Sequence, residues 1–333
     1  MTATLRSEQV IPAEWARQDA ILVGFPSHQA LWEGALLSEA RQEVAALCNN
    51  LSEVQTCHVM VANHDSEQSA RKLLSSRCHI HRFDFGDIWF RDIAPIFFNP
   101  AQALRFNHNG WGEKYLYPFD DSVAARCEDY FKVNTQYFDF VLEGGALDHN
   151  GRGDILTTKQ CLLNANRNHW SQPQAEDMLR QAFNANNIYW LNNGLSFDHT
   201  DGHVDNAARF INPQTILCQQ ATGNDDPNAG LYNSHMIELQ DQGLLTNTIP
   251  SPGLIKDANG DIMPASHLNF VLANELVIFP HYLKYTFANK ISVDETKEKL
   301  SDMFQGREVL SLPSNALLTG GGSFHCITQH IPK

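Results

Sequence analysis

The sequence lacks the features of several common classes of protein. No run of about 18 apolar residues occurs among its 333 residues, so no membrane-spanning helix is expected. The first twenty residues contain charges and Pro12 but no apolar signal core. The seven cysteines are odd in number and include no Cys-x-x-Cys pair, which argues against a disulfide framework or a structural zinc site. A reducing cytoplasm is therefore the expected location.

Basic residues are also scarce. Lysine and arginine together number 24 against 38 aspartates and glutamates, which gives a formal net charge of −14. A nucleic-acid partner would require a basic face, so none is expected. The acidic excess is compatible with a cationic substrate. Hydrophobic residues make up 43% of the chain and charged residues 19%, which is typical of a globular protein with a substantial core.

Patterns of short strands and amphipathic helices alternate along the whole chain. The predicted helices cover about 36–51, 121–132, 171–183 and 227–241, and a last one begins at Ser292, which has capping-box spacing to Glu295. The predicted strands are 20–25, 57–62, 79–85, 93–98, 103–106, 141–142, 155–158, 188–191, 207–211, 216–219, 267–273, 275–280 and 309–312. The stretch 246–264 contains three prolines and two glycines and is interpreted as a surface loop. Residues 1–333 are thus predicted to form one α/β domain.

Four short segments are dense in side chains that carry chemistry. They are residues 87–92 (DIWFRD), 143–145 (EGG), 198–206 (DHTDGHVDN) and 320–326 (GGGSFHC). Each segment alone also has a structural interpretation, such as a buried salt bridge or a turn, and a single cysteine is most often a small buried hydrophobe. Three glycines before Cys326 instead predict a loop that brings backbone and sulfur close to a ligand.

Together these segments favour nucleophilic catalysis. Cys326 would be the nucleophile and His203 its acid–base partner. The surplus of acids fits a planar cationic substrate, because carboxylates bind a guanidinium through two charge-assisted hydrogen bonds. The alternative is a metal site built from His199 and His203, with neighbouring aspartates as further ligands. Gly202 disfavours the helix that such a site would need, and the motif lacks the glutamate of zinc hydrolases.

Six motifs occur in a fixed order along the chain and carry a resemblance. They are residues 12–15 (PAEW), 87–92 (DIWFRD), 107–112 (NHNGWG), 143–145 with 161–168 (EGG and CLLNANRN), 201–206 (DGHVDN) and 320–329 (GGGSFHCITQ). In these motifs the sequence resembles the agmatine deiminase and bacterial peptidyl-arginine deiminase family of the guanidine-modifying (pentein) superfamily. One motif alone would be weak, but six in order are specific and span essentially the whole chain.

The resemblance implies both a fold and a mechanism. The fold would be a single-domain α/β propeller of five ββαβ-like units around a pseudo-fivefold axis, with the active site at its centre. Cys326 would attack the guanidinium carbon to form a covalent amidino-cysteine, with His203 acting first as acid and then as base. Asp92 and Asp205 would hold the guanidinium nitrogens. Glu143 would support His203 or add a further carboxylate to the guanidinium.

The resemblance also implies a substrate. Trp89 and Trp111 would belong to the substrate pocket, where an aromatic face favours a cation. The best-populated branch acts on agmatine and often carries an acidic pair where this chain has Asp198 and His199. Glu113, at a position where glycine is frequent, could restore the missing charge if it faces the pocket. The expected reaction converts agmatine and water to N-carbamoylputrescine and ammonia, a step of putrescine biosynthesis. Peptidyl-arginine, free arginine or another ω-guanidino compound is the alternative.

The remaining expectations concern partners and rival activities. No metal or organic cofactor is implied, and a small cationic guanidino compound is the expected partner, with a homodimer as one option for the assembly. An amidinotransferase would share the covalent half-reaction but pass the amidino group to an amine, and a binding protein would not turn its ligand over. Carboxylates near Cys326 should raise the pKa of its thiol. His325 should face away from the nucleophile's side and play a supporting role.

Overall fold

The structure is a computed structural model that describes residues 10–285 and 290–333. Its helices are α1 (Leu36–Val54), α2 (His64–Leu73), α3 (Phe90–Ile93), α4 (Gly110–Glu113), α5 (Val123–Phe131), α6 (Lys159–Leu162), α7 (Gln172–Phe183), α8 (Ala229–Asp241), α9 (Lys290–Met303) and α10 (Asn315–Thr319), with short 3-10 turns η1 (Gln29–Leu31), η2 (Asp120–Ser122), η3 (Gly144–Ala146) and η4 (Val204–Asn206). Its strands are β1 (Gln18–Gly24), β2 (Thr56–Val61), β3 (Cys78–Arg82), β4 (Ile96–Asn99), β5 (Gln102–Asn107), β6 (Asn134–Val141), β7 (Leu147–His149), β8 (Asp154–Thr158), β9 (Asn187–Leu191), β10 (Ala208–Asn212), β11 (Thr215–Gln220), β12 (Leu245–Pro250), β13 (Val271–Leu272), β14 (Leu276–His281), β15 (Glu308–Pro313) and β16 (Thr328–Pro332).

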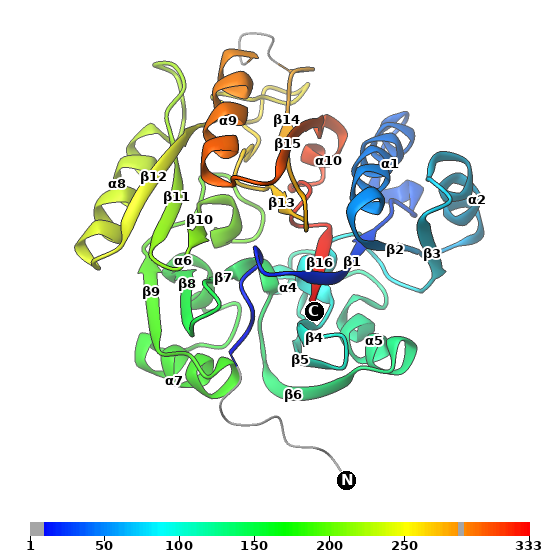
Figure 1. Cartoon of the computed structure of the whole chain (residues 1–333), viewed down its shortest axis with the longest axis horizontal. Helices are drawn as coiled ribbons and strands as arrows, with labels where there is room; N and C mark the ends of the chain where they lie inside the picture. Colours follow the sequence, from blue (N-terminus) through cyan, green and yellow to red (C-terminus); the bar gives the residue numbers. More distant parts are fainter. Residues whose placement is uncertain (1–9, 286–289) are drawn as a thin grey trace.

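These strands form five small sheets around a common centre (Figure 1). Four sheets have three strands each, in the orders β4-β5-β6, β7-β8-β9, β10-β11-β12 and β13-β14-β15. In each of them the first two strands pair antiparallel and the last two pair parallel. The fifth sheet, β16-β1-β2-β3, follows the same rule, because β1 pairs antiparallel with β16 and parallel with β2. The repeated pattern confirms the predicted ββαβ-like units, and the last strand of the chain completes the unit that β1 begins.

The long helices are the crossovers that parallel pairing requires. Helices α1, α5, α7, α8 and α9 each connect the two parallel strands of one unit, and they lie around the outside of the molecule (Figure 1). The sequence dictates this position in α1, where Leu37, Val44 and Leu51 recur at helical spacing and are all buried. One apolar stripe thus faces the sheets while the opposite face of the helix meets solvent.

The middle strand of a unit is covered on both faces. In β11, Ile216, Leu217 and Cys218 are all fully buried, although their side chains alternate between the two faces of the sheet. Such a strand appears in the sequence as a short continuous apolar run, which is why it could be predicted. The hydrophobic core is accordingly divided into several clusters between sheets and helices.

Several predicted elements differ from the structure, and the predicted strand 267–273 contains only the two residues of β13. The stretch 246–264 is not entirely a loop, because its first residues belong to β12, whose outer half is exposed and therefore lacks an apolar pattern. Strand β6 begins at Asn134, well before the predicted 141–142, and its first residues are polar and partly exposed. Helix α9 begins at Lys290, so Ser292 lies buried within it and is not its N-cap. The spacing of Ser292 and Glu295 is also the spacing of neighbours on one helix face.

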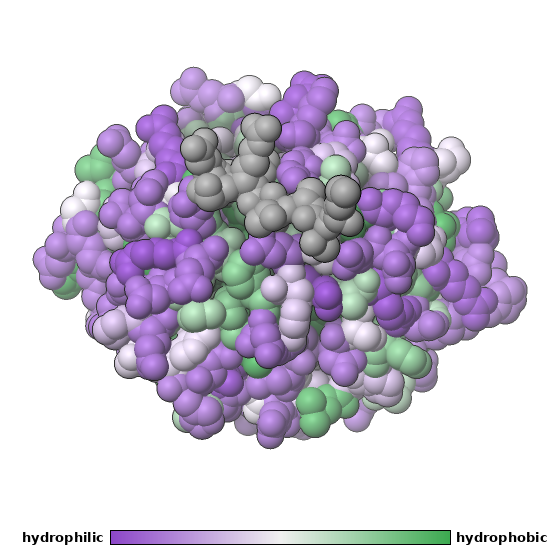
Figure 2. Space-filling model, turned by 90° about the horizontal axis from the view of Figure 1, so that it is seen from below, coloured by the Kyte–Doolittle hydropathy of each residue, from purple (hydrophilic) through white to green (hydrophobic). Residues whose placement is uncertain are grey.

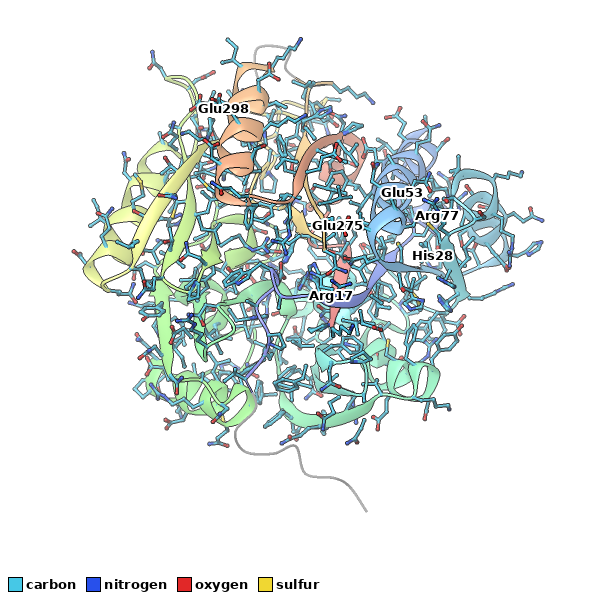
Figure 3. The ribbon with its side chains drawn as sticks, viewed as in Figure 1. Arg17, His28, Glu53, Arg77, Glu275 and Glu298 are labelled. Carbon is cyan, nitrogen blue, oxygen red and sulfur yellow. The ribbon has the colours of Figure 1, made fainter. Side chains whose placement is uncertain are left out.

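The surface is mainly polar. No helix in the described part of the chain is long and apolar enough to cross a membrane. The face shown in Figure 2 is largely hydrophilic, with smaller hydrophobic areas between the polar side chains. Charged side chains such as Glu53 and Arg77, which form an exposed ion pair, lie on the outside of the first unit (Figure 3).

Candidate active site

Residues with functional side chains precede the strand of each unit that lies nearest the centre. These strands are β16, β4, β7, β10 and β13 (Figure 1). Because the five units repeat the same geometry around one centre, positions just before these strands converge, however far apart they are in the sequence. The residues at these positions are Cys326 before β16, Asp92 before β4, Glu143 before β7, His203 and Asp205 before β10, and Asn269 before β13.

Cys326 is a buried thiol, with 6% of the residue exposed. Its Sγ lies 3.6 Å from Oδ2 of Asp205 and accepts a hydrogen bond of 3.0 Å from Nδ2 of Asn269. Burial raises the pKa of the Cys326 thiol, the carboxylates of Asp205 and Asp92 raise it further, and hydrogen bonds from Ser323 and Asn269 lower it less. The net shift is well above the usual range, in the direction predicted from the sequence, so the resting group is a thiol.

His203 lies between two carboxylates. Its Nδ1 is 3.7 Å from Oδ1 of Asp92 and its Nε2 is 3.9 Å from Oε2 of Glu143. Neither ring nitrogen makes a hydrogen bond within the described structure, although both are buried. Burial lowers the pKa of His203, but Asp92, Cys161 and Glu143 raise it more, and the net pKa lies well above its usual range. The ring is therefore an imidazolium with a proton to give.

Asp92 is a fixed acceptor beside His203. Its Oδ2 accepts a hydrogen bond of 2.9 Å from Nε1 of Trp111, and its Oδ1 accepts one of 2.9 Å from the backbone amide of Gly145. Burial raises the pKa of Asp92 to about 6, although the charge of His203 lowers it. Glycine is required at 145, because a Cβ there would lie 2.6 Å from Nδ1 of His203 and 2.9 Å from Asp92. The missing side chain lets the acid and the imidazole approach each other.

Asp205 is also fixed through one oxygen. Its Oδ2 lies 2.8 Å from Nδ1 of His325, whose Nε2 lies 2.8 Å from Oε1 of Glu14. Its Oδ1 is buried and has no hydrogen-bond partner in the described structure. The expected supporting role of His325 thus has a geometric basis, since its ring contacts Asp205 and is not among the side chains that line the cavity described below.

Glu143 completes the surroundings of His203. Its Oε1 accepts a hydrogen bond of 2.8 Å from Nε of Arg167. Burial raises the pKa of Glu143, but His203 and Arg167 lower it more, to about 2. Glu143 is therefore a carboxylate that stabilises the imidazolium.

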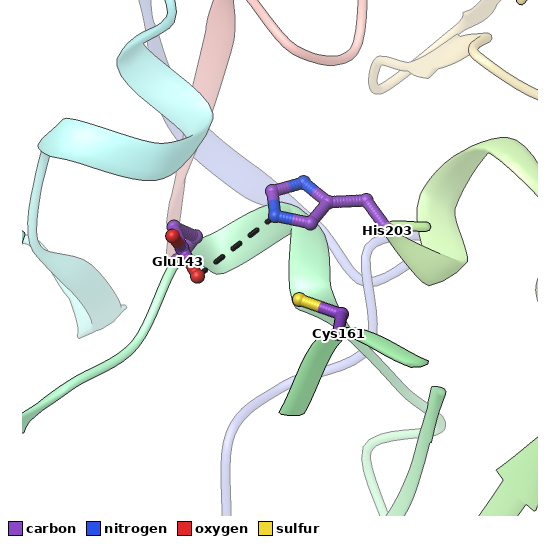
Figure 4. Close-up of side chains that lie close together, drawn as sticks. All are labelled: Glu143, Cys161 and His203. Atoms are coloured by element: carbon purple, nitrogen blue, oxygen red, sulfur yellow. Dashed lines mark ion pairs between the residues drawn. The ribbon is translucent and has the colours of Figure 1, made fainter. Parts of the chain in front are cut away.

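Glu143, Cys161 and His203 are close enough together to raise the question of a metal (Figure 4). Among the described residues, this trio is the one group in which three metal-ligating atoms all lie within 4.8 Å of one another. Arg167 already binds one oxygen of Glu143, and the raised pKa of His203 favours a proton on the ring. The charges of the trio therefore suit a proton better than a metal cation. His199 is not in the group, so the alternative site of His199 and His203 is not supported.

A cavity of about 270 Å³ leads to these residues. Cys326 and Asp92 line it, and His203 and Asp205 lie within 4 Å of these two side chains. Five aromatic side chains line it, and none of the described lining residues is a lysine or an arginine; the aromatic lining side chains are Trp32, Trp89, Trp111, Tyr115 and Tyr117. A volume of this size suits a small molecule with an apolar middle and a cationic head.

The three glycines before Cys326 line the same cavity. Gly321 has φ +94°, and a Cβ there would lie 2.5 Å from Nδ1 of His199. A Cβ at Gly322 would lie 2.6 Å from the ring of Trp89 and 3.2 Å from Cβ of Cys326. The glycine run therefore allows the loop to pack against the aromatic wall while it positions the sulfur.

Comparison with known proteins agrees with this geometry. The family model of the Porphyromonas-type peptidyl-arginine deiminases matches residues 10–332. The chain belongs to this family. It is 31% identical to a Vibrio parahaemolyticus protein named "Putative agmatine deiminase", with 96% of each chain covered.

Solved structures of this family share the fold. A cysteine-to-serine variant of C. jejuni agmatine deiminase with substrate bound is 27% identical, with a TM-score of 0.88 over 97% of this chain and 96% of that one. The agmatine deiminase of Enterococcus faecalis is 24% identical, with a TM-score of 0.89 over 100% and 99% of the two chains, and shows the fold alone. Membership in the family makes the protein a hydrolase of the C–N bonds of linear amidines.

Within this deiminase site, the predicted residues do not all converge. Glu113 is exposed, and neither it nor Asp198 is among the residues that line the cavity. Oδ1 of Asp198 accepts hydrogen bonds from the backbone and hydroxyl of Thr200, and its Oδ2 is buried without a hydrogen-bond partner in the described structure. A contact of Glu113 or Asp198 with the substrate stays a prediction. His199 does line the cavity.

Several residues of the site had no predicted role, among them Cys161 beside His203. Glu14 and Arg167 lie in motifs of the resemblance, but nothing in their local sequence showed that they contact His325 and Glu143. Asn269 lies just before β13 and donates to Cys326. Asn269 precedes β13 as Asp92 precedes β4 and Asp205 precedes β10, so a fivefold repeat detectable in the sequence would have identified it.

Proposed function

We propose that the protein hydrolyses the guanidino group of a small cationic substrate through a covalent intermediate on Cys326. The observation that carries the proposal is the convergence of a thiol, an imidazolium and two carboxylates at the inner end of one cavity. Asp92 and Asp205 bind the guanidinium nitrogens, and their charges orient the planar cation with its carbon toward the sulfur.

The first half of the reaction forms the intermediate. The bound cation offsets the charges of Asp92 and Asp205, so the thiol of Cys326 loses its proton to solvent. The thiolate attacks the guanidinium carbon and forms a C–S bond. His203 then donates its proton to the departing nitrogen, the C–N bond breaks, and ammonia leaves. An S-alkylthiouronium remains on Cys326.

The second half releases the product. His203, now neutral, takes a proton from a water molecule as that water attacks the same carbon. The C–S bond then breaks as the hydroxyl proton of the tetrahedral adduct passes to the departing sulfur, so Cys326 returns as a thiol and a neutral ureido compound leaves. Glu143 keeps the imidazole ring of His203 oriented and stabilises its charged form in each cycle, which is the role expected of a carboxylate behind a catalytic histidine.

We infer that the substrate is agmatine. The lining of the cavity contains no lysine or arginine, so it offers no cation for the carboxylate of free arginine. The aromatic walls suit a methylene chain and, through their faces, a second positive charge. Relatives named as agmatine deiminases support the same choice. Peptidyl-arginine is the second candidate, because the matching family carries that name.

Release of ammonia from agmatine, free arginine and a blocked arginine peptide, measured side by side, tests the proposal. Agmatine should give the highest kcat/KM and N-carbamoylputrescine as product. A higher kcat/KM for the peptide would identify peptidyl-arginine as the substrate and leave the proposed reaction unchanged. Product formed only after addition of an acceptor amine would instead show an amidinotransferase. Loss of activity with a chelator, restored by a metal, would contradict the cysteine mechanism.

A further inference from the structure

A chain of buried side chains runs from the start of the described sequence to the nucleophile. Oε1 of Glu14 lies 2.8 Å from Nε2 of His325, and Nδ1 of the same ring lies 2.8 Å from Oδ2 of Asp205. The three residues are 8%, 2% and 0% exposed. The chain ends at Cys326, whose Sγ is 3.6 Å from that Oδ2. His325 therefore connects two carboxylates, one of which faces the reacting sulfur.

Both carboxylates are ionised. Burial raises the pKa of Glu14, but Arg209, His325 and other nearby cations hold it well below its usual range. Burial also raises the pKa of Asp205, and the hydrogen bond from His325 holds it below its usual range. The geometry gives the protonation of the ring independently: each ring nitrogen of His325 lies 2.8 Å from a carboxylate oxygen, and an ionised carboxylate can only accept, so both nitrogens donate. A ring that donates from both nitrogens is an imidazolium.

We propose that His325 is a positioning residue, an imidazolium between two carboxylates that keeps Asp205 ionised and holds it beside the sulfur for the guanidinium of the substrate. The inference rests on the proposed function. His325 contacts Oδ2 of Asp205, the oxygen that lies 3.6 Å from Sγ of Cys326, whereas Oδ1 is buried and has no hydrogen-bond partner in the described structure. The carboxylate therefore keeps acceptor capacity for a guanidinium N–H. His325 contacts Asp205 and Glu14, so it acts through Asp205.

The charges around His325 require its positive charge. The titratable and charged groups that face it from the surrounding elements, directly or through these carboxylates, are Glu14, Arg91, Asp148, His203, Asp205, Arg209, His330 and the neighbouring Cys326. Burial raises the pKa of Asp148 to about 6 although Arg209 lowers it, so Asp148 is mainly ionised at neutral pH. Burial lowers the pKa of His330, which is neutral there.

Three carboxylates in this cluster therefore face two guanidiniums, while the charge of His203 lies between Asp92 and Glu143, so His325 supplies the third positive charge. Without that charge, one buried carboxylate has no compensation, and burial then favours its neutral form. Asp205 is the acid that loses its direct cationic partner. The consequence would reach the substrate, because a neutral Asp205 cannot form a charge-assisted hydrogen bond to the guanidinium as strong as that of the carboxylate.

The test replaces the charge and keeps a polar side chain. In His325→Gln, agmatine should bind on the order of tenfold or more weakly, measured as KM and as Kd in a Cys326→Ser background. The acid limb of kcat/KM should move to higher pH, because Asp205 takes up a proton more readily. Glu14→Gln should also weaken agmatine binding and move the acid limb of kcat/KM to higher pH, but both changes should be smaller than in His325→Gln. Circular dichroism checks that each variant is folded.

A matched control separates positioning from general damage to the cluster. His330→Gln alters the same buried cluster, since Nδ1 of His330 accepts from Arg91 at 2.8 Å, but His330 has no contact with Asp205. Its KM and acid limb should match those of the wild type. Equal shifts in His330→Gln and His325→Gln would overturn the inference.

The charge of His325 can also be observed without turnover. Nitrogen-15 NMR of histidine-labelled protein should show a doubly protonated ring across neutral pH whose signal disappears in His325→Gln. A neutral ring at that position overturns the inference. If the wild-type protein is active and His325→Gln has the same KM, the inference about His325 is overturned and the proposed function stands. Wild-type protein that deiminates no guanidino compound overturns the proposed function, and the positioning role with it.

Discussion

At the residue scale, the sulfur of Cys326 lies in surroundings that oppose its ionisation. Burial and two carboxylates raise the pKa of the thiol, and the hydrogen bond from Asn269 compensates only in part. In the proposed reaction the same carboxylates bind the guanidinium. The acids would then keep Cys326 protonated until the substrate arrives, and the positive charge of the substrate would favour the thiolate.

This coupling can be measured by alkylation of Cys326. A small neutral alkylating agent should react slowly with the free enzyme at pH 8, because little thiolate is present. Binding of a cationic guanidine analogue that leaves the sulfur accessible should increase the rate. Mass spectrometry of the labelled peptide assigns the site. An unchanged rate with the analogue bound would contradict substrate-assisted ionisation.

Replacement of the sulfur should separate binding from turnover. Cys326→Ala is expected to lower kcat by on the order of 10⁴-fold or more, because the covalent step is lost. Calorimetry should still detect agmatine binding, since Asp92 and Asp205 are unchanged. Full activity in this variant would exclude the proposed mechanism.

Asp92 should give the enzyme an acid limb in its pH profile. Burial raises the pKa of Asp92 to about 6 in the free protein, and only the carboxylate binds the guanidinium strongly. kcat/KM should therefore fall as the pH drops through about 6, because that ratio reports the free enzyme. kcat should fall only at lower pH, since bound substrate stabilises the carboxylate. A kcat/KM that stays constant to pH 5 would contradict this assignment.

At the element scale, the loop of residues 320–326 depends on backbone that approaches side chains closely. Gly320 and Gly322 leave room for the ring of Trp89, and Gly321 adopts a left-handed conformation against His199. The close contacts of this loop with its neighbours therefore fix the position of the sulfur. The short turns before the other central strands position the acids and His203 in the same way. At Gly145, for example, the missing side chain leaves room for His203 and Asp92.

A methyl group at Gly322 should disturb the site without breaking the fold. In Gly322→Ala, the new Cβ meets Trp89 at 2.6 Å, so the aromatic wall or the loop must move. kcat/KM should fall about 10- to 100-fold, because displacements near 1 Å have such costs in active sites. Gly230→Ala is the control, since its Cβ would meet nothing within 4 Å. Steady-state kinetics that show equal activity in both variants would refute the role of the loop.

At the scale of the whole molecule, buried ion pairs connect the units at the centre of the ring that the five units form. Glu14 lies beside Arg209 from β10, Arg91 from α3 and His325 from the loop before β16. A segment at the start of the described chain thus connects three of the five units. Burying such a cluster stabilises the fold only while every charge has its partner.

Removal of Glu14 should therefore destabilise the whole protein. Glu14→Ala leaves the guanidiniums of Arg91 and Arg209 without this carboxylate, and breaking a buried pair typically costs about 3–5 kcal/mol. The control is Arg77→Ala, which removes one partner of the exposed pair with Glu53 and should leave the melting temperature nearly unchanged. Equal melting temperatures of Glu14→Ala and the wild type would contradict the role of the cluster.

Local sequence patterns were sufficient for much of the fold and for the short segments that supply the proposed reacting groups. Continuous apolar runs predicted buried strands such as β11, and the apolar spacing of Leu37, Val44 and Leu51 predicted α1. Polar, partly exposed strands such as β6 and β12 could not be predicted, because their pairing partners supply the stability that their own residues do not. The motifs indicated Cys326 and His203 because glycines and charged residues so arranged are unusual.

The amino-acid sequence by itself determined which chemical groups are present and in which short segments they lie. Only the tertiary structure decided which of them meet. The five units bring together residues from Glu14 to Cys326, and they place Asn269 on the sulfur and His325 on Asp205. They also leave Glu113 in solvent and Asp198 bound to Thr200. Convergence around one centre is a property of the whole ring, so no local pattern records it.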